Sequence, residues 1–151
     1  LRQPPKLGFE TIRSPGNFAT PVARELLRAL EQAGARVLPP EPPRQPGQPA
    51  PETEPVDVVL DVLTDQRERA VVGITATGQV RELQLRTRFR FRLRSGQGAD
   101  LIEDSELLQT RDISFTETAV LGKEAEEALM YKDMQTDIVQ QVLRRLSVVK
   151  R

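Results

Sequence analysis

Cysteine and histidine are missing from the sequence, and so is tryptophan. Without thiol or imidazole groups, the chain can form no disulfide, no zinc or iron–sulfur site with such ligands, and no catalytic pair that needs Cys or His. An enzyme built on this chain would depend on Asp, Glu, Lys, Arg or Tyr, although histidine is the usual acid–base residue near neutral pH. We therefore predict a protein that is not an enzyme and that uses no metal or other cofactor.

Long apolar runs are also missing. No stretch approaches the roughly 18 to 20 apolar residues that a transmembrane helix needs. The first residues, Leu1-Arg2-Gln3-Pro4-Pro5, resemble neither a signal peptide nor an initiator methionine, so we expect the chain to start inside a longer precursor. Its 151 residues fit one domain, which we predict to span residues 1–151.

Charge is balanced in total but unevenly distributed. The chain has 22 basic and 22 acidic residues. Residues 81–94 hold six Arg against one Glu, a net +5, whereas residues 100–133 hold ten acids against three bases, a net −7. This separation predicts a surface with distinct charged faces rather than a general attraction to nucleic acid.

The first forty residues predict a strand, a helix and a second strand. Residues 9–13 have the pattern of a short strand. Thr20 and Pro21 are typical of the first positions of a helix, and Gly34 is typical of the residue after its end, so we predict a helix over 20–33. Residues 36–38 form a second short strand. The segment 39–55 contains eight prolines, and we predict a mobile loop there.

From Val56 onward the apolar residues alternate with a period of two. The run from Val56 to Thr64 shares one face and resumes at Ala70, Val72 and Ile74. A second strand over 81–94 follows a turn at Thr77-Gly78, and a third over about 101–115 has an irregular pattern that suggests a β-bulge. An amphipathic helix over about 122–146 ends the chain, its apolar stripe including Leu129.

Strands that alternate cleanly bury one face, so both helices should cover that face. The predicted fold is α+β, a two-layer sandwich with two helices packed on one face of a mainly antiparallel sheet of four or five strands. The predicted core contains the following residues: Leu26, Leu30, Leu60, Val62, Leu85, Phe89, Phe91, Met134, Ile138 and Val142.

The strand over 81–94 has the most distinctive pattern. Its odd positions from Leu83 to Leu93 are apolar apart from one Thr, and the even positions from 86 to 94 are all arginine: Arg86, Arg88, Arg90, Arg92 and Arg94. Neighbouring arginines on this face stand about 6.7 Å apart. Two interpretations are open. The face is either solvated and paired with acids on adjacent strands, such as Asp61, Asp65 or Glu103, or it binds a multiply anionic ligand.

Two other functions fit the residues poorly. Single-stranded nucleic acid binds to sheets whose aromatic and basic residues share one face, but here Phe89 and Phe91 point away from the arginines. Adjacent carboxylates such as Glu126 and Glu127 point apart, so a carboxylate-based hydrolase has no visible acid pair. Lys123 is a cation at the start of the last helix, where the helix dipole disfavours positive charge. It is either simply solvated or a ligand contact.

Several segments, taken together and in order, resemble the LptE (RlpB, rare lipoprotein B) family of lipopolysaccharide-assembly lipoproteins. They are Leu1-Arg2 with Pro4–Leu7, Leu30–Gly34, Thr77–Gln79 with Glu82–Leu85, Arg111-Asp112, Leu121–Glu124, and Tyr131–Met134 with Val139–Leu146.

The resemblance implies a non-enzymatic lipoprotein on the periplasmic face of the outer membrane. It implies a lipid anchor on a cysteine upstream of Leu1, a role as the plug and partner of the LptD β-barrel, and direct binding of lipopolysaccharide through basic residues. One family contact falls on Lys123, and a second, an arginine, falls on Ala76. Arg81 or the arginines from Arg86 to Arg94 would then supply the missing charge. The predicted ligand-binding residues are Lys123, Arg86, Arg88, Arg90 and Arg92. The alternative is an envelope module that binds another anionic partner, such as an acidic protein or a peptidoglycan-linked ligand.

Overall fold

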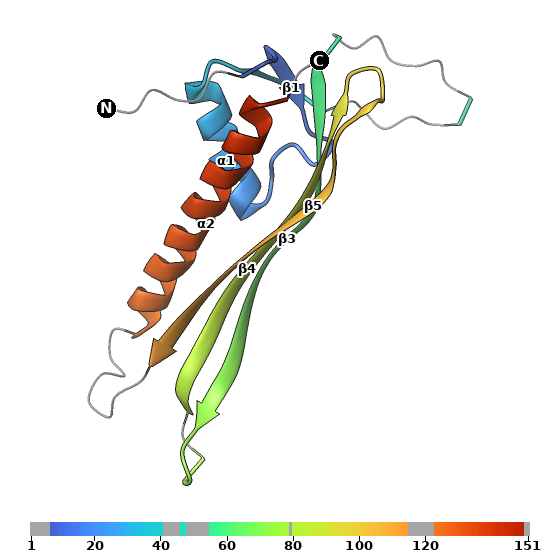
Figure 1. Ribbon diagram of the computed structural model, residues 1–151. Helices are drawn as coiled ribbons and strands as arrows, with labels where there is room; N and C mark the ends of the chain where they lie inside the picture. Colours follow the sequence, from blue (N-terminus) through green and yellow to red (C-terminus); the bar gives the residue numbers. More distant parts are fainter. Residues whose placement is uncertain (1–6, 41–45, 48–54, 79, 115–122, 150–151) are drawn as a thin grey trace.

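The computed structural model describes residues 7–40, 46–47, 55–78, 80–114 and 123–149. Two helices lie on one face of a five-stranded sheet (Figure 1), as predicted. The elements follow in this order: β1 (Thr11–Arg13), α1 (Pro21–Gln32), β2 (Arg36–Leu38), β3 (Val58–Ile74), β4 (Val80–Ser95), β5 (Asp100–Ser114) and α2 (Lys123–Ser147). The proline-rich segment predicted to be mobile lies largely outside the described residues.

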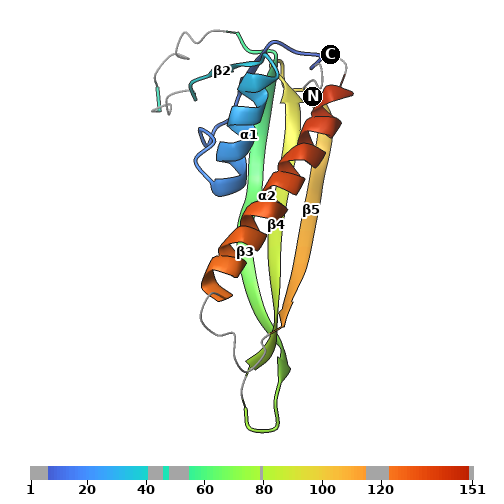
Figure 2. The same ribbon diagram turned by 90° about the vertical axis from the view of Figure 1, so that its left-hand side faces the viewer.

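The sheet is mixed rather than purely antiparallel. Its strand order is β2-β1-β3-β4-β5. The three long strands form an antiparallel meander, whereas β1 pairs in parallel with both β2 and β3. Parallel pairing of β1 with β2 follows from α1, because a helix between two strands returns the chain to the end from which it started. The opposite face of the three long strands carries no helix (Figure 2).

Both helices begin and end within two residues of the predicted positions. Pro21 occupies the first turn of α1, where its missing N–H removes no helical hydrogen bond. After Gln32 the chain turns through Gly34, whose φ of +95° suits glycine, and Ala35 N–H donates to Leu30 O at 2.9 Å. The amides at the start of α1 are satisfied from β3, because Asp65 Oδ2 accepts from Val22 N–H at 3.0 Å.

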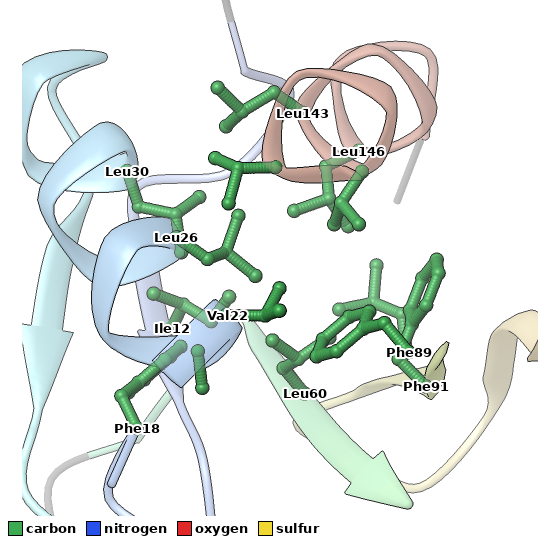
Figure 3. Packing of buried hydrophobic residues seen from close by; sticks show 14 of the residues in the cluster. Ile12, Phe18, Val22, Leu26, Leu30, Leu60, Phe89, Phe91, Leu143 and Leu146 are labelled. Atoms are coloured by element: carbon green, nitrogen blue, oxygen red, sulfur yellow. The ribbon is translucent and has the colours of Figure 1, made fainter. Parts of the chain in front are cut away.

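The main core fills the space between the two helices and the sheet (Figure 3). Phe89 and Phe91 from β4 lie fully buried below the helices, with ring centroids 5.7 Å apart. A smaller cluster of Leu85, Ile113 and Met134 continues under the first half of α2. Nine of the ten predicted core residues are buried, and Val62 is half-buried.

β-Bulges explain why some residues of the long strands face the other side of the sheet from the one predicted. The predicted irregularity in β5 is confirmed, because the β4–β5 register shifts near Ile102. An unpredicted shift in β3 lies between Val62 and Thr64. One extra residue reverses the side-chain alternation beyond it, so the odd positions from Asp65 to Val71 face the helices. The register shifts twice more between Val71 and Ile74. The prediction that Val72 and Ile74 continue the buried face is therefore wrong, and both side chains are more than half exposed.

Candidate functional site

The arginines of β4 lie on the sheet face that the helices leave uncovered. We call Arg86, Arg88, Arg90, Arg92 and Arg94 the arginine ladder. On the helix side, the odd positions of β4 from Leu83 to Leu93 are buried, which confirms the predicted alternation. Each ladder side chain is about one-third to one-half exposed. A single strand thus supplies a core face and a charged outer face.

Carboxylates on both neighbouring strands pair with the ladder. At one end, Asp61 on β3 accepts from Arg94 Nε at 2.6 Å and from Arg92 Nη2 at 3.1 Å. Asp104 on β5 pairs with Arg90 through both of its oxygens. Every contact joins side chains on the same sheet face, as expected for cross-strand pairs.

Toward the other end of the ladder, glutamates take over this role. Glu106 Oε1 accepts from Arg88 Nη1 at 2.8 Å, and Glu68 lies 3.5 Å from Arg88 Nε and 3.8 Å from Arg86 Nη1. Five arginines against the four carboxylates Asp61, Glu68, Asp104 and Glu106 leave a net charge of +1 (5 − 4). The ladder is thus an ion-pair network, and Asp100 opposite Arg94 adds a further negative charge at its end.

Of the three predicted acidic partners, Asp61 is confirmed. Asp65 faces the helices because of the β3 bulge and caps α1 instead. Asp104 rather than Glu103 meets Arg90, because the β5 bulge changes which residue of that strand faces outward. The sequence showed the acids, but their faces depended on the two bulges.

Electrostatics holds these pairs in their charged forms. Partial burial alone would raise the pKa of Asp61, but the hydrogen bonds from Arg94 and Arg92 outweigh it and hold that pKa below its usual value. The hydrogen bond from Arg90 likewise lowers the pKa of Asp104, and the same bond raises the pKa of Arg90. A phosphate would reach a ladder guanidinium by sharing it with a carboxylate or by displacing that carboxylate.

Lys123 and the arginine ladder lie on different sides of the sheet. Lys123 is the first residue of α2, which packs on the inner face, and its side chain lies outside the described part of the structure. Ala76, where the resemblance expects an arginine, is exposed in the turn between β3 and β4. The start of α2 and this turn lie at the same end of the molecule, far from β1 (Figure 1). The side chain of Arg81 lies outside the described part as well.

Sequence reasoning missed a polar contact between β3 and α2. Arg69 Nε lies 2.9 Å from Glu127 Oε1, and the Arg67 guanidinium lies 5.0 Å from the centre of the Tyr131 ring. Tyr131 Oη donates to Glu68 O at 2.8 Å. Partial burial raises the pKa of this tyrosine. In the sequence, this contact could have been predicted from the run of polar and charged residues from Thr64 to Arg69. A strand that buries a continuous apolar face would not contain such a run.

Other chemistry is scarce in the part of the chain that is described. A cavity of about 490 Å³ near the β4–β5 turn is lined in part by Arg13 and Arg94. Among the described residues, no three acidic side chains are arranged to hold a metal ion. None of the helices among them has the length and apolar character needed to cross a membrane.

The chain is similar to a known protein family and to the solved structures of several lipoproteins. A sequence model of the LptE family, described as lipopolysaccharide-assembly, matches residues 9–146. The solution structure of an uncharacterized lipoprotein B from Nitrosomonas europaea is similar over 97% of this chain and 88% of its own, with 29% identity and a TM-score of 0.73. No curated protein matches.

Two crystal structures share the fold at lower identity. The rare lipoprotein B from Shewanella oneidensis is 18% identical over 89% of this chain and 91% of its own, with a TM-score of 0.67. A minor lipoprotein from Acinetobacter baumannii is also 18% identical, over 93% and 92% of the two chains, with a TM-score of 0.65.

Proposed function

Because this chain belongs to the LptE family of lipopolysaccharide-assembly proteins, we propose that it is a non-enzymatic lipoprotein that partners an LptD-type β-barrel and binds lipopolysaccharide. It acts as a single domain over residues 1–151. As the family resemblance implies, it is anchored by lipid on a cysteine upstream of Leu1, at the periplasmic face of the outer membrane. The observation that carries this proposal is the family match over 138 residues (146 − 9 + 1).

The uncovered sheet face supports the role of a barrel partner. It combines the arginine ladder, its carboxylates and the exposed side chain of Leu108 on one surface. The lumen of an outer-membrane barrel is lined by polar and charged groups. A face on which arginines and carboxylates alternate can match such a wall pair by pair.

In addition to their ion pairs, we propose that the basic residues bind lipopolysaccharide. Lipid A carries phosphates, and arginine engages phosphate through two parallel hydrogen bonds. The proposed contacts are Lys123, Arg86, Arg88, Arg90 and Arg92. Since the sheet separates Lys123 from the ladder, we assign them to two contact regions, one at the start of α2 and one on the open face.

Pull-down tests the barrel partnership. The acylated full-length protein is co-expressed with candidate barrels and recovered from detergent, and we expect an LptD-type barrel to be retained. Recovery of an acidic soluble protein or a peptidoglycan fragment in its place would favour the alternative envelope module.

Substitution of three arginines tests the ladder. Arg88→Ser, Arg90→Ser and Arg92→Ser together should weaken lipopolysaccharide binding and reduce its dependence on salt. Stability should fall by no more than about 3 kcal/mol, because three partly exposed ion pairs are lost and each contributes about 1 kcal/mol or less. The matched control removes three exposed arginines from the helices, Arg24, Arg28 and Arg144. Equal affinity of both triple variants at low salt would remove the ladder from the binding site.

Lys123 is tested separately because it lies elsewhere on the molecule. Lys123→Glu should weaken lipopolysaccharide binding on its own, since it replaces attraction to a phosphate by repulsion. Lys132→Glu is the control, because it makes the same charge change at an exposed position of the same helix. If both variants bind as the unmodified chain does, Lys123 is not a contact.

A further inference from the structure

The cavity near the β4–β5 turn opens on the sheet face that the helices leave uncovered. Arg13, Val59 and Arg94 are direct neighbours across β1, β3 and β4, and all three line it. The residue that precedes each of them in the chain is fully buried in the core, so these three side chains point to the opposite side of the sheet. A volume of about 490 Å³ is within the range of small-molecule sites, about 300 to 1,000 Å³.

Two guanidinium groups flank this cavity, with Val59 between them. Because the backbones of β1 and β4 are two strand spacings apart, about 10 Å, a small group fits between their side chains. Arg13 is 6% exposed, and its Nε donates to Pro39 O at 3.0 Å. Arg94 donates to Asp61 through one edge of its guanidinium, from Nε at 2.6 Å and from Nη2 at 3.1 Å. Its Nη1 donates to no residue in the described ranges.

The rest of the described lining is apolar or uncharged. Pro15, Pro55 and Val56 add to the apolar surface of Val59, and the turn Ser95–Gly98 completes the lining. Among the described residues around the cavity, none is acidic. Two cations beside an apolar wall fit an anion that carries an apolar group.

The backbone of the turn indicates which anion fits. Phosphate sites commonly use several backbone N–H groups that point toward the ligand. In this turn they are used within the protein, because Gly96 N–H donates to Asp57 O at 2.9 Å and Gly98 N–H donates to Ser95 O at 2.9 Å. Gln97 N–H donates to Ser95 Oγ at 3.3 Å. Two guanidinium groups match the two oxygens of a carboxylate, whereas a phosphate would have a further charged oxygen against the apolar wall.

We propose that this cavity binds a small organic acid, in which a carboxylate is joined to an apolar group of a few carbons. Arg13 and Arg94 hold the two oxygens, and the prolines and valines contact the apolar group. β1 and the β4–β5 turn lie at the end of the molecule opposite to the start of α2 (Figure 1). The cavity therefore lies away from Lys123, and Arg94 is not among the proposed contacts of lipopolysaccharide. An acid without phosphate or long acyl chains makes this site independent of the proposed function.

Titration with 4-methylpentanoate tests the site, because this probe has one carboxylate and one branched apolar group. The amide signals of Gly96 and Gly98 in ¹⁵N–¹H NMR spectra report on the cavity, and that of Gly78 in the distant β3–β4 turn is the control. We expect the probe to shift only the two cavity signals, with a Kd on the order of 1 mM. 4-Methylpentanamide lacks the charge and acetate lacks the apolar group, so both should bind at least about tenfold more weakly.

Substitution of the arginines gives a second measurement. Arg94→Gln removes one of the two cationic donors and should weaken binding of 4-methylpentanoate by about tenfold. Arg92→Gln is the matched control, because Arg92 also pairs with Asp61 but is not among the described residues that line the cavity. Its Kd should stay within about twofold of the unmodified value. Arg13→Lys keeps the charge but loses the fork of donors, so it should also weaken binding.

Three results would contradict a carboxylate site. If 4-methylpentanoate shifts neither cavity glycine, or if its amide shifts them equally, the cavity does not recognise a carboxylate. If 3-methylbutyl phosphate binds more tightly than 4-methylpentanoate, the cavity prefers phosphate and the assigned class of ligand is wrong. If the Arg92 and Arg94 variants bind the acid equally well, the acid lies outside the cavity.

Discussion

The substitution Asp61→Asn tests two properties of the arginine ladder. One is its contribution to the free energy of unfolding, and the other is the effect of its net charge on ligand binding. Asp61 is shared by Arg92 and Arg94, and its side chain, 13% exposed, is the least exposed of the four carboxylates that pair with the ladder. It accepts four hydrogen bonds, two from Arg92 and two from Arg94, with lengths of 2.6 to 3.2 Å. Asparagine keeps the shape and one oxygen but loses the charge, and its NH₂ group cannot accept a hydrogen bond from the arginines.

The expected loss of stability follows from the exposure of the partners. A hydrogen bond to a charged group contributes about 1.5 to 3 kcal/mol when it is protected from water. The Arg92 and Arg94 side chains are 40% and 32% exposed, so water replaces part of what Asp61 provided. We therefore expect Asp61→Asn to lower the free energy of unfolding by about 1 to 2 kcal/mol at pH 7. Asp133→Asn, at a side chain that is 77% exposed, should cost almost nothing.

Dependence on pH identifies the cause of that loss. The pKa of Asp61 is lower in the folded chain than its usual value, so its stabilising effect is complete above the usual pKa. It disappears as the pH falls through the lowered pKa, when the folded chain is also protonated. Urea unfolding followed by circular dichroism between pH 7 and 3 should show the two chains converging at low pH. A loss below about 0.3 kcal/mol, or one that stays constant over this range, would refute the ion-pair account.

The same substitution raises the net charge of the ladder by one unit. If the ladder binds lipid A phosphates as proposed, Asp61→Asn should bind lipopolysaccharide more tightly at low salt although it is less stable. Lower stability together with unchanged affinity would mean that the ladder is structural.

Three further substitutions test the fold. Phe91→Ala should cost about 3 to 5 kcal/mol in urea unfolding, since the ring is fully buried; a loss under about 1 kcal/mol would contradict the assignment of the β4 faces. Asp65→Ala should cost about 1 to 2 kcal/mol, because the carboxylate caps α1 through Val22 N–H, and unchanged amide exchange in α1 would contradict this. Tyr131→Phe should cost about 1 kcal/mol through the lost bond to Glu68 O; thermal unfolding would show no change if the hydroxyl were solvated instead.

Local patterns in the sequence determined the element order and most of the core. Pro21 and Gly34 marked the ends of α1 because their backbone requirements are met at few other places in a chain. Alternation placed Phe89 and Phe91 inside and the ladder outside, since an antiparallel strand with one solvated face has a strict period of two.

Only the tertiary structure decided which face each later residue of β3 occupies. The bulge after Val62 moved Asp65 to the helix side, where it caps α1, and further register shifts precede Val72 and Ile74, which are exposed near the β3–β4 turn. A bulge depends on how two strands pair, and one strand's pattern does not contain that information. For the same reason the sequence showed a row of five arginines, but only the register of β4 with its two neighbours shows which carboxylates neutralise them.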